Sequence, residues 1–213
     1  MIHVIPTVFA HTKEEFQKRF SSLIKFAPAI QIDFMDEEFV PAKSVPLSIV
    51  PDLKKFKVKF EAHLMVAHPE EWIEEVAKKG FSKIIVHIET IKNTERGLDL
   101  FHRIRTRGAQ PMLAINAETS MERLEPYLTC IQDLLVMGIH PGREHQGLVP
   151  NTARRVSMLK KRGFFVQVDG GVNDRTIGKL VSAGVDVVNV GSYIADAKDH
   201  KKAYQMIVQA FKK

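Results

Sequence analysis

The chain is short of the features that mark secreted, membrane-spanning and low-complexity proteins. Its 213 residues include a single cysteine, Cys130, which excludes an internal disulfide and fits a reducing compartment, so we expect a cytoplasmic location. No apolar run approaches the roughly 20 residues that a membrane helix needs, so we expect no membrane partner. The first residues, MIHVIPTVFAHTKEE, lack the basic, apolar and small-residue order of a signal peptide.

The composition is that of a globular protein with a small positive net charge. Apolar residues make up 45% and charged residues 26% of the chain, and the length suffices for a sizeable core, so we expect a single domain over residues 1–213. Lysine and arginine outnumber aspartate and glutamate by 31 to 25. These cations are scattered through helix-like stretches without interleaved aromatics, which favours a solvated outer face over nucleic-acid binding. The positive balance also favours encounter with small anionic substrates.

Short β-branched runs alternate with amphipathic stretches along the whole chain. The runs predict eight strands, at 2–9, 29–35, 58–66, 83–89, 110–116, 133–139, 164–170 and 185–191. The stretches between and after them predict helices near 12–27, 47–56, 69–79, 94–107, 120–129, 151–162, 173–183 and 199–211. Thr12 with Glu15 and Thr119 with Glu122 have the spacing of capping boxes. Strict alternation predicts parallel βαβ units, and the simplest closed arrangement of eight is an α/β fold of the (β/α)8 or TIM-barrel type.

Three of the strand runs end in an ionisable residue, namely Asp33, His63 and Asp169. Because side chains alternate across a strand, Asp33 shares a face with Gln31 and Met35. A buried carboxylate or imidazole is costly unless it is paired, liganded or used in chemistry. Barrel active sites lie at the carboxyl ends of the strands, so the three residues predict one polar site. The fourth and fifth strand runs also end in polar residues, which are His87 and Glu89 in the fourth and Asn116 in the fifth.

The last two strand runs are followed by glycines. The sequences are VDGGV at 168–172 and VNVGSYI at 188–194. Loops after strands seven and eight commonly bind phosphate in barrels, because glycine lets backbone N–H groups approach an anion. The alternative is that they form tight turns only. We therefore take as candidate phosphate-binding residues Gly170, Gly171, Gly191 and Ser192.

Five segments, in order and over almost the full chain, resemble the ribulose-phosphate 3-epimerase family. Residues 30–41, IQIDFMDEEFVP, resemble the family's usual H-x-D-x-M-D-G-x-F-V-P-N, and residues 63–73 resemble H-L-M-V-x-x-P-x-x-[YW]-I. Residues 113–128 and 136–150 resemble A-L-N-P-x-T-x-x-x-x-L-x-x-x-L and V-M-x-V-N-P-G-F-G-G-Q-x-F-I-P. Residues 168–194 resemble the family's last two strands nearly throughout. The resemblance implies a single TIM barrel of the ribulose-phosphate-binding type.

The resemblance also implies a reaction and the residues that perform it. Asp33 and Asp169 would be an acid/base pair that epimerises a phosphorylated ketose at C3 through an enediolate, such as ribulose 5-phosphate to xylulose 5-phosphate. A divalent metal (Zn, Mn, Mg or Fe) would be held by Asp33, His63 and Asp169. Substrate would contact Thr7, Met35, Met65, Met137 and His63, and its phosphate would add Gly142 and Gln146 to the glycines above. Without the resemblance, the three methionines are ordinary core residues. Family members are often dimers or hexamers, which implies a homo-oligomer.

The chain departs from the family pattern at the site itself. Gln31 stands where the family has a metal-binding histidine, and a glutamine oxygen is a poor ligand for zinc, so metal binding is left open. Residues 141–146, PGREHQ, lose two glycines of the loop that cradles phosphate, and Glu37 and Glu38 add negative charge after the second strand. The alternative to an active epimerase is therefore a catalytically impaired, phosphosugar-binding barrel with a regulatory role. Related decarboxylases and synthases need D-x-K-x-x-D on the third strand, where residues 61–66 of this chain read EAHLMV and contain no lysine.

Overall fold

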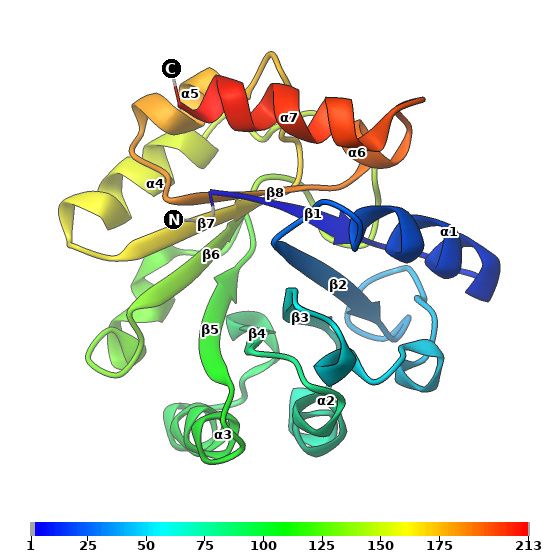
Figure 1. Ribbon diagram of the computed structural model, residues 1–213. Coiled ribbons are helices and arrows are strands. Elements are labelled where there is room, and N and C mark those ends of the chain that lie inside the picture. Colours follow the sequence, from blue (N-terminus) through cyan, green and yellow to red (C-terminus); the bar gives the residue numbers. More distant parts are fainter. Residues whose placement is uncertain (1–2, 213) are drawn as a thin grey trace.

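The core of the computed structural model, which describes residues 3–212, is a closed barrel of eight parallel strands (Figure 1). The order follows the sequence, and pairing of the first strand with the last closes the barrel. The strands are β1 (Val4–Val8), β2 (Ala29–Met35), β3 (Lys59–Met65), β4 (Lys83–His87), β5 (Gln110–Ile115), β6 (Asp133–Met137), β7 (Phe165–Asp169) and β8 (Val187–Val190). The predicted (β/α)8 architecture is confirmed.

Helices surround the strands, with α7 beside β8 and β1 and with α2 and α3 on the opposite side (Figure 1). They are α1 (Lys13–Leu23), α2 (Ile73–Lys79), α3 (Thr94–Thr106), α4 (Thr152–Lys161), α5 (Ile177–Ser182), α6 (Ser192–Ala195) and α7 (His200–Phe211). The predicted capping box starts α1, since the Thr12 hydroxyl accepts from the Glu15 N–H while the Glu15 carboxylate accepts from the Thr12 N–H. The buried side of α1 presents Phe16 and Phe20 to the core.

Two of the predicted helices are not α-helices. The stretch 47–56 contains two short 3-10 segments, η1 (Leu47–Ile49) and η2 (Leu53–Lys55), and the stretch 120–129 contains η5 (Met121–Tyr127). Further 3-10 segments are η3 (Pro69–Glu71) and η4 (Ile88–Thr90). Pro51 and Pro126 explain the first two cases, because proline lacks the N–H that an α-helix uses and disfavours helical geometry in the residue before it. The predicted cap at Thr119 is also wrong: Ser120 accepts from the Glu122 N–H.

Strand register brings the polar residues to one level of the barrel. Asp33 of β2 pairs with His63 of β3, and Asp169 of β7 pairs with Met137 of β6 and Asn189 of β8. The alternate residues of each strand face outwards and pack beneath the helices; in β2 these are Ile30, Ile32 and Phe34, all 0% exposed. The polar residues between them therefore project into the barrel.

A second polar layer lies inside the barrel nearer the amino ends of the strands. Lys83 of β4 places its ammonium 3.2 Å from Glu61 and 3.5 Å from Asp133, and the Gln167 amide donates to Glu61 at 2.8 Å. An apolar group that includes Ile85 packs in the neighbouring interior. Since these buried charges pair with one another, they are satisfied within the barrel. The polar residues at the opposite, carboxyl ends form the candidate site.

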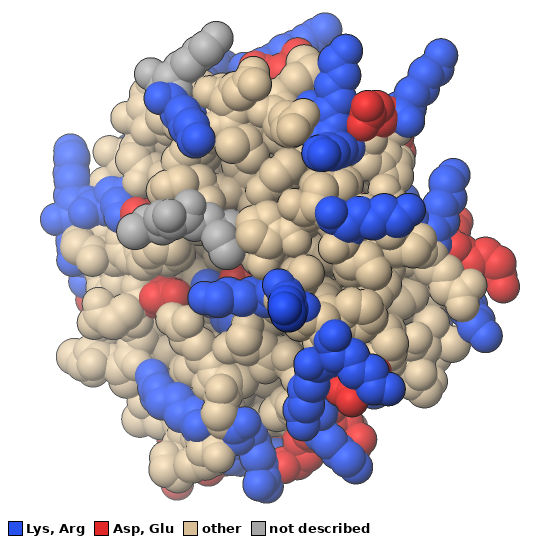
Figure 2. Space-filling model, in the orientation of Figure 1, with Lys and Arg blue, Asp and Glu red and all other residues tan. Residues whose placement is uncertain are grey.

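The outer surface carries its charges in dispersed form. Figure 2 shows lysine and arginine side chains spread over the whole of one face, several of them beside acidic side chains, without one continuous basic patch. The surface ion pairs of the protein include Arg107 with Glu74 and Arg162 with Glu125. Within residues 3–212, the helices fall short of the length and apolar character that crossing a membrane requires.

Candidate active site

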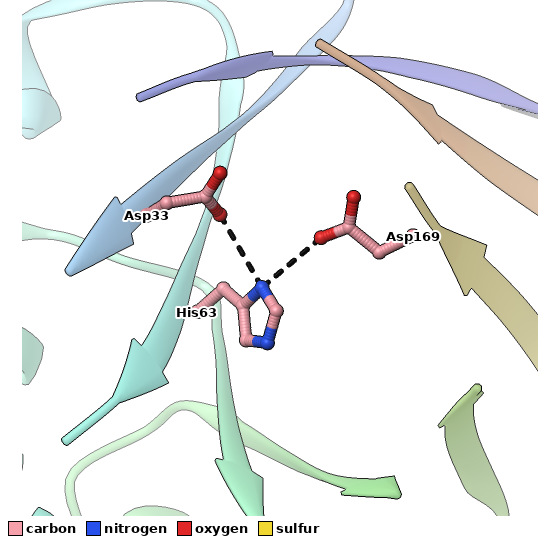
Figure 3. A group of neighbouring side chains, drawn as sticks. All are labelled: Asp33, His63 and Asp169. Carbon is pink, nitrogen blue, oxygen red and sulfur yellow. Dashed lines mark ion pairs between the residues drawn. The ribbon is translucent and has the colours of Figure 1, made fainter. Parts of the chain in front are cut away.

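Asp33, His63 and Asp169 converge inside the barrel, with the imidazole between the two carboxylates (Figure 3). His63 Nδ1 lies 3.3 Å from Asp33 Oδ1 and 3.0 Å from Asp169 Oδ2. All three residues are buried, and their candidate ligand atoms lie within 4.8 Å of one another. A buried group of this composition can hold a metal ion.

The Gln31 amide lies in the middle of this group. Its Nε2 is 2.8 Å from Asp33 Oδ1, 2.6 Å from Asp169 Oδ2 and 3.3 Å from His63 Nδ1. Its Oε1 points the other way and accepts a 2.7 Å hydrogen bond from Asn189 Nδ2. Both hydrogens of the amide are thus available to the two carboxylates, and its lone pairs face away from them.

The donor set does not fit a divalent cation in this arrangement. A metal needs oxygen or nitrogen lone pairs directed at one point. Here an N–H2 group contacts the oxygens of Asp33 and Asp169 that a cation would bind, and the Gln31 oxygen is already hydrogen-bonded to Asn189. The chemistry of the site therefore rests on its own side chains.

A chain of hydrogen bonds leads from the group to the end of β4. His63 Nε2 is 2.9 Å from His87 Nε2, and His87 Nδ1 is 3.2 Å from Glu89 Oε2. Glu89 Oε1 accepts from the Asn116 N–H at 2.9 Å. This chain orients both imidazoles and connects the centre of the barrel with a partly exposed carboxylate.

The environment shifts the pKa values of Asp33, His63 and His87. Burial raises the pKa of Asp33 from 3.8 to about 6, against the lowering effect of its hydrogen bond with His63. Burial also disfavours the charged form of His63, but its hydrogen bonds to Asp169 and Asp33 outweigh that effect and raise its pKa from 6.5 to about 9. Burial lowers the pKa of His87. At neutral pH the group thus holds an imidazolium at His63, which donates to a neutral His87.

A cavity of about 560 Å³ opens above the carboxylates at the carboxyl end of the barrel. It brings together twelve of the residues predicted from sequence: Thr7, Asp33, Met35, Met65, Met137, Gly142, Gln146, Asp169, Gly170, Gly171, Gly191 and Ser192. His63 and Gln31, which are fully buried, do not line it and lie behind the carboxylates. The residues predicted to contact substrate are therefore gathered on one cavity, with the exception of His63.

The glycines after β7 and β8 are required by close packing. Gly170 and Gly171 have φ values of +94° and +71°, and a Cβ on Gly171 would lie 2.7 Å from the Leu148 backbone. A Cβ on Gly191 would lie 2.8 Å from the hydroxyl oxygen of Thr7. These positions leave backbone exposed at the cavity wall, where an anion can approach it.

In the loop between β6 and α4, the side chains of Glu144, His145 and Gln146 contact neighbouring residues. The Glu144 carboxylate accepts two 3.0 Å hydrogen bonds from the Arg19 guanidinium of α1, and its Oε1 lies 3.4 Å from where a Cβ of Gly191 would be. His145 has a φ of +63°, a conformation that favours glycine, and its ring is 2.8 Å from Asp196. The Gln146 amide donates to two carbonyls of its own loop, at 2.7 and 2.8 Å. This loop therefore presents a carboxylate to the cavity.

Sequence reasoning missed two contributors to this arrangement. Asn189, which fixes the Gln31 amide, is a polar residue in an otherwise apolar strand, and that is the same signal that singles out Gln31. Arg19 lies among ordinary charged residues of an amphipathic helix, and the sequence around it gives no sign of its pairing with Glu144.

The closed parallel barrel, with two carboxylates facing one cavity at the carboxyl ends of its strands, defines a barrel enzyme equipped for acid–base chemistry. A family model described as the ribulose-phosphate 3 epimerase family matches residues 3–195. The chain belongs to this family of isomerases acting on carbohydrates. At the positions described above it is a divergent member.

Curated relatives named ribulose-phosphate 3-epimerase support the assignment over the length of the chain. The protein of Methanocaldococcus jannaschii is 30% identical, with 97% of this chain and 88% of that protein covered. The protein of Aquifex aeolicus is 32% identical, with 81% and 80% covered.

Solved structures share the fold at much lower identity. KGPDC from Streptococcus mutans superposes with a TM-score of 0.82 at 14% identity, covering 99% of this chain and 97% of that one. The 3-hexulose-6-phosphate synthase of Salmonella typhimurium superposes with a TM-score of 0.75 at 16% identity, covering 99% and 98%. These likenesses confirm the barrel.

Proposed function

We propose that the protein is a sugar-phosphate 3-epimerase that interconverts ribulose 5-phosphate and xylulose 5-phosphate, or a closely related pair of ketose phosphates. The observation that carries the proposal is the presence of Asp33 and Asp169 on either side of one cavity floor, both within 3.3 Å of the same imidazole nitrogen. Family membership supports the substrate class. A relative from Oryza sativa named as a cytoplasmic isoform supports the same compartment for this chain.

The proposed reaction transfers protons at the carbon next to a ketone. One aspartate, as the carboxylate, removes the C3 proton, and the electron pair of the C–H bond moves towards the carbonyl oxygen as the enediolate forms. The other aspartate, as the protonated carboxylic acid, then delivers its proton to the opposite face of C3, so that the two groups exchange protonation states over one turnover. A pKa of about 6 suits Asp33 for accepting a proton near neutral pH. The positive charge of His63 behind both carboxylates and the Thr7 hydroxyl on the cavity wall would stabilise the developing oxyanion.

The substrate phosphate would bind between the loops after β7 and β8. Gly170, Gly171 and Gly191 expose backbone there, and Ser192 adds a hydroxyl. Because Glu144 lies against Gly191, its carboxylate would repel the phosphate. We expect the phosphate to displace Glu144 and to draw the Arg19 guanidinium towards itself, since both anions suit a bidentate guanidinium.

Proton exchange with solvent provides the test. Purified protein is incubated with ribulose 5-phosphate in D2O, and deuterium at C3 and formation of xylulose 5-phosphate are followed by NMR. We expect both in the wild type and loss of both, by at least about a hundredfold, in Asp33→Asn and Asp169→Asn. Glu37→Gln, which changes an exposed carboxylate outside the cavity, is the matched control. Absence of exchange with ribulose 5-phosphate and with other ketose 5- and 6-phosphates would refute the proposal.

The position of Glu144 favours one second candidate, a barrel that binds a phosphorylated ligand without turnover. Its carboxylate fills part of the space expected for phosphate, and Arg19 holds it in place. This function predicts that ribulose 5-phosphate raises the melting temperature while no deuterium enters C3. Turnover in the exchange experiment would exclude it.

A further inference from the structure

The feature that carries a further inference is the direction in which the Gln31 amide points. Its nitrogen contacts one carboxylate oxygen of Asp33 and one of Asp169, at 2.8 and 2.6 Å, and the side chain is 0% exposed. A bridging position between two carboxylates inside a protein calls for positive charge or hydrogen-bond donors. The two N–H groups of one amide meet this need for both carboxylates.

Asn189 determines which end of the amide faces the carboxylates. Its Nδ2 donates to Gln31 Oε1 at 2.7 Å, and Asn189 is also 0% exposed. Rotating the Gln31 amide alone would place its oxygen about 2.6 to 2.8 Å from two carboxylate oxygens and would oppose two N–H2 groups at the other end. Both contacts are repulsive, so the pair holds Gln31 with its donors towards the carboxylates.

We propose that the Gln31 amide, fixed by Asn189, takes the place of a divalent cation between Asp33 and Asp169 and keeps the two carboxylates in position without a metal. Gln31 is on this account a positioning residue, since it lies behind the cavity and does not touch substrate. The inference concerns the same site as the proposed function. Through Gln31, the two carboxylates are held in place before substrate binds.

The same contacts specify what a metal would require. Gln31 could offer an oxygen only if both amides turned together, and Asn189 Oδ1, which has no hydrogen-bond partner among the residues that the structure describes, would then accept from Gln31. That change would leave Asn189 Nδ2 without the acceptor that it has now. Metal binding therefore competes with an arrangement in which the Asp33 and Asp169 oxygens are already satisfied.

Metal affinity of variants at position 31 tests the proposal. Chelator-treated protein is titrated with Co2+ alone, which is followed by its visible absorption and by calorimetry. Gln31→Glu keeps the size of the side chain and puts an oxygen in place of the N–H2 group, and Gln31→His supplies an imidazole. We expect both variants to bind Co2+ at least about a hundredfold more tightly than the wild type, and Co2+ to raise their melting temperatures but not that of the wild type.

Asn189→Asp provides a second test. The new carboxylate can only accept a hydrogen bond from Gln31, so the Gln31 amide should turn its oxygen towards Asp33 and Asp169, and Co2+ affinity should rise. Leu98→Asp, on the exposed side of α3, is the control for an added carboxylate elsewhere. One equivalent of Zn, Mn or Fe that co-purifies with the wild type, or Co2+ affinities equal in the wild type and the position-31 variants, would overturn the proposal. These readouts need no turnover, so failure of the epimerase proposal and failure of this one are distinguished.

Discussion

The protonated state of His63 predicts that the fold loses stability in mildly alkaline solution. The pKa of this imidazole is 6.5 in the unfolded chain and about 9 in the folded protein, where Asp169 and Asp33 hold its proton. A group whose pKa is raised by folding contributes stability that is complete below the unfolded value and is lost as the pH rises through the folded value. At about 1.4 kcal/mol per pH unit, the contribution of His63 is roughly 3 kcal/mol, lost between about pH 6.5 and 9.

Asp33 also makes the free energy of unfolding depend on pH, but only at pH values below this interval. Folding raises the pKa of its carboxyl from 3.8 to about 6, so its ionisation costs stability as the pH rises from about 4 to 6 and adds no further change above that. The interval above pH 6.5 therefore isolates His63. Burial also raises the pKa values of Cys130, Tyr127, Tyr193 and Tyr204, but these groups are common to the wild type and His63→Gln, so their effects cancel when the two proteins are compared.

Urea unfolding of the wild type and of His63→Gln, measured at half-unit steps from pH 6 to 9.5, gives the contribution by difference. We expect the wild type to lose roughly 3 kcal/mol relative to the variant over this range. The imidazole signals of His63 in NMR spectra provide a direct second measurement. Equal slopes in the two proteins, or titration of His63 near pH 6.5, would refute the reasoning.

Three further predictions concern activity and the loops. The value of kcat/KM for ribulose 5-phosphate should rise through about pH 6 as Asp33 loses its proton and fall above about pH 9 as His63 does, and a flat profile between pH 5 and 10 would contradict these assignments. Glu144→Gly should lower KM by roughly five- to tenfold with kcat unchanged, because it removes about 1 kcal/mol of repulsion between the carboxylate and the substrate phosphate. Arg19→Ala should raise KM. Steady-state kinetics measures both effects, and a change in kcat instead of KM would contradict this reasoning. Gly171→Ala should lower the free energy of unfolding by roughly 1 to 3 kcal/mol, because its Cβ would lie 2.7 Å from the Leu148 backbone at a φ of +71°, and an unchanged urea midpoint would show the reasoning to be wrong.

The polar centre was predictable because it depends on local rules. Asp33, His63 and Asp169 each end an apolar run, and in a parallel barrel the carboxyl ends of all strands meet. Strand alternation then predicts that Gln31 faces the same interior as Asp33, which the structure confirms.

The contacts that fix the Gln31 amide and the Glu144 carboxylate are made by residues that are distant in the chain. The direction of the Gln31 amide is set by Asn189, which is 158 positions away. The Glu144 carboxylate is held by Arg19 across 125 positions. Neither pairing leaves a local pattern, because a hydrogen bond between distant elements depends on rotamers and register that only the folded barrel provides.

The two departures from the family pattern act on different steps of the proposed reaction. Gln31 satisfies the carboxylates internally, so the proton-transfer centre is organised before any ligand binds. Glu144 is also satisfied internally, by Arg19, but it lies at the cavity wall where a phosphate would have to replace it. As proposed above, the Gln31 amide stands in for a metal ion between the two carboxylates, whereas Glu144 adds a cost to binding of the substrate phosphate. On this reasoning the affinity for the phosphorylated substrate, rather than proton transfer, limits the protein at low substrate concentration, and Glu144→Gly should restore kcat/KM more than any variant of Gln31 does.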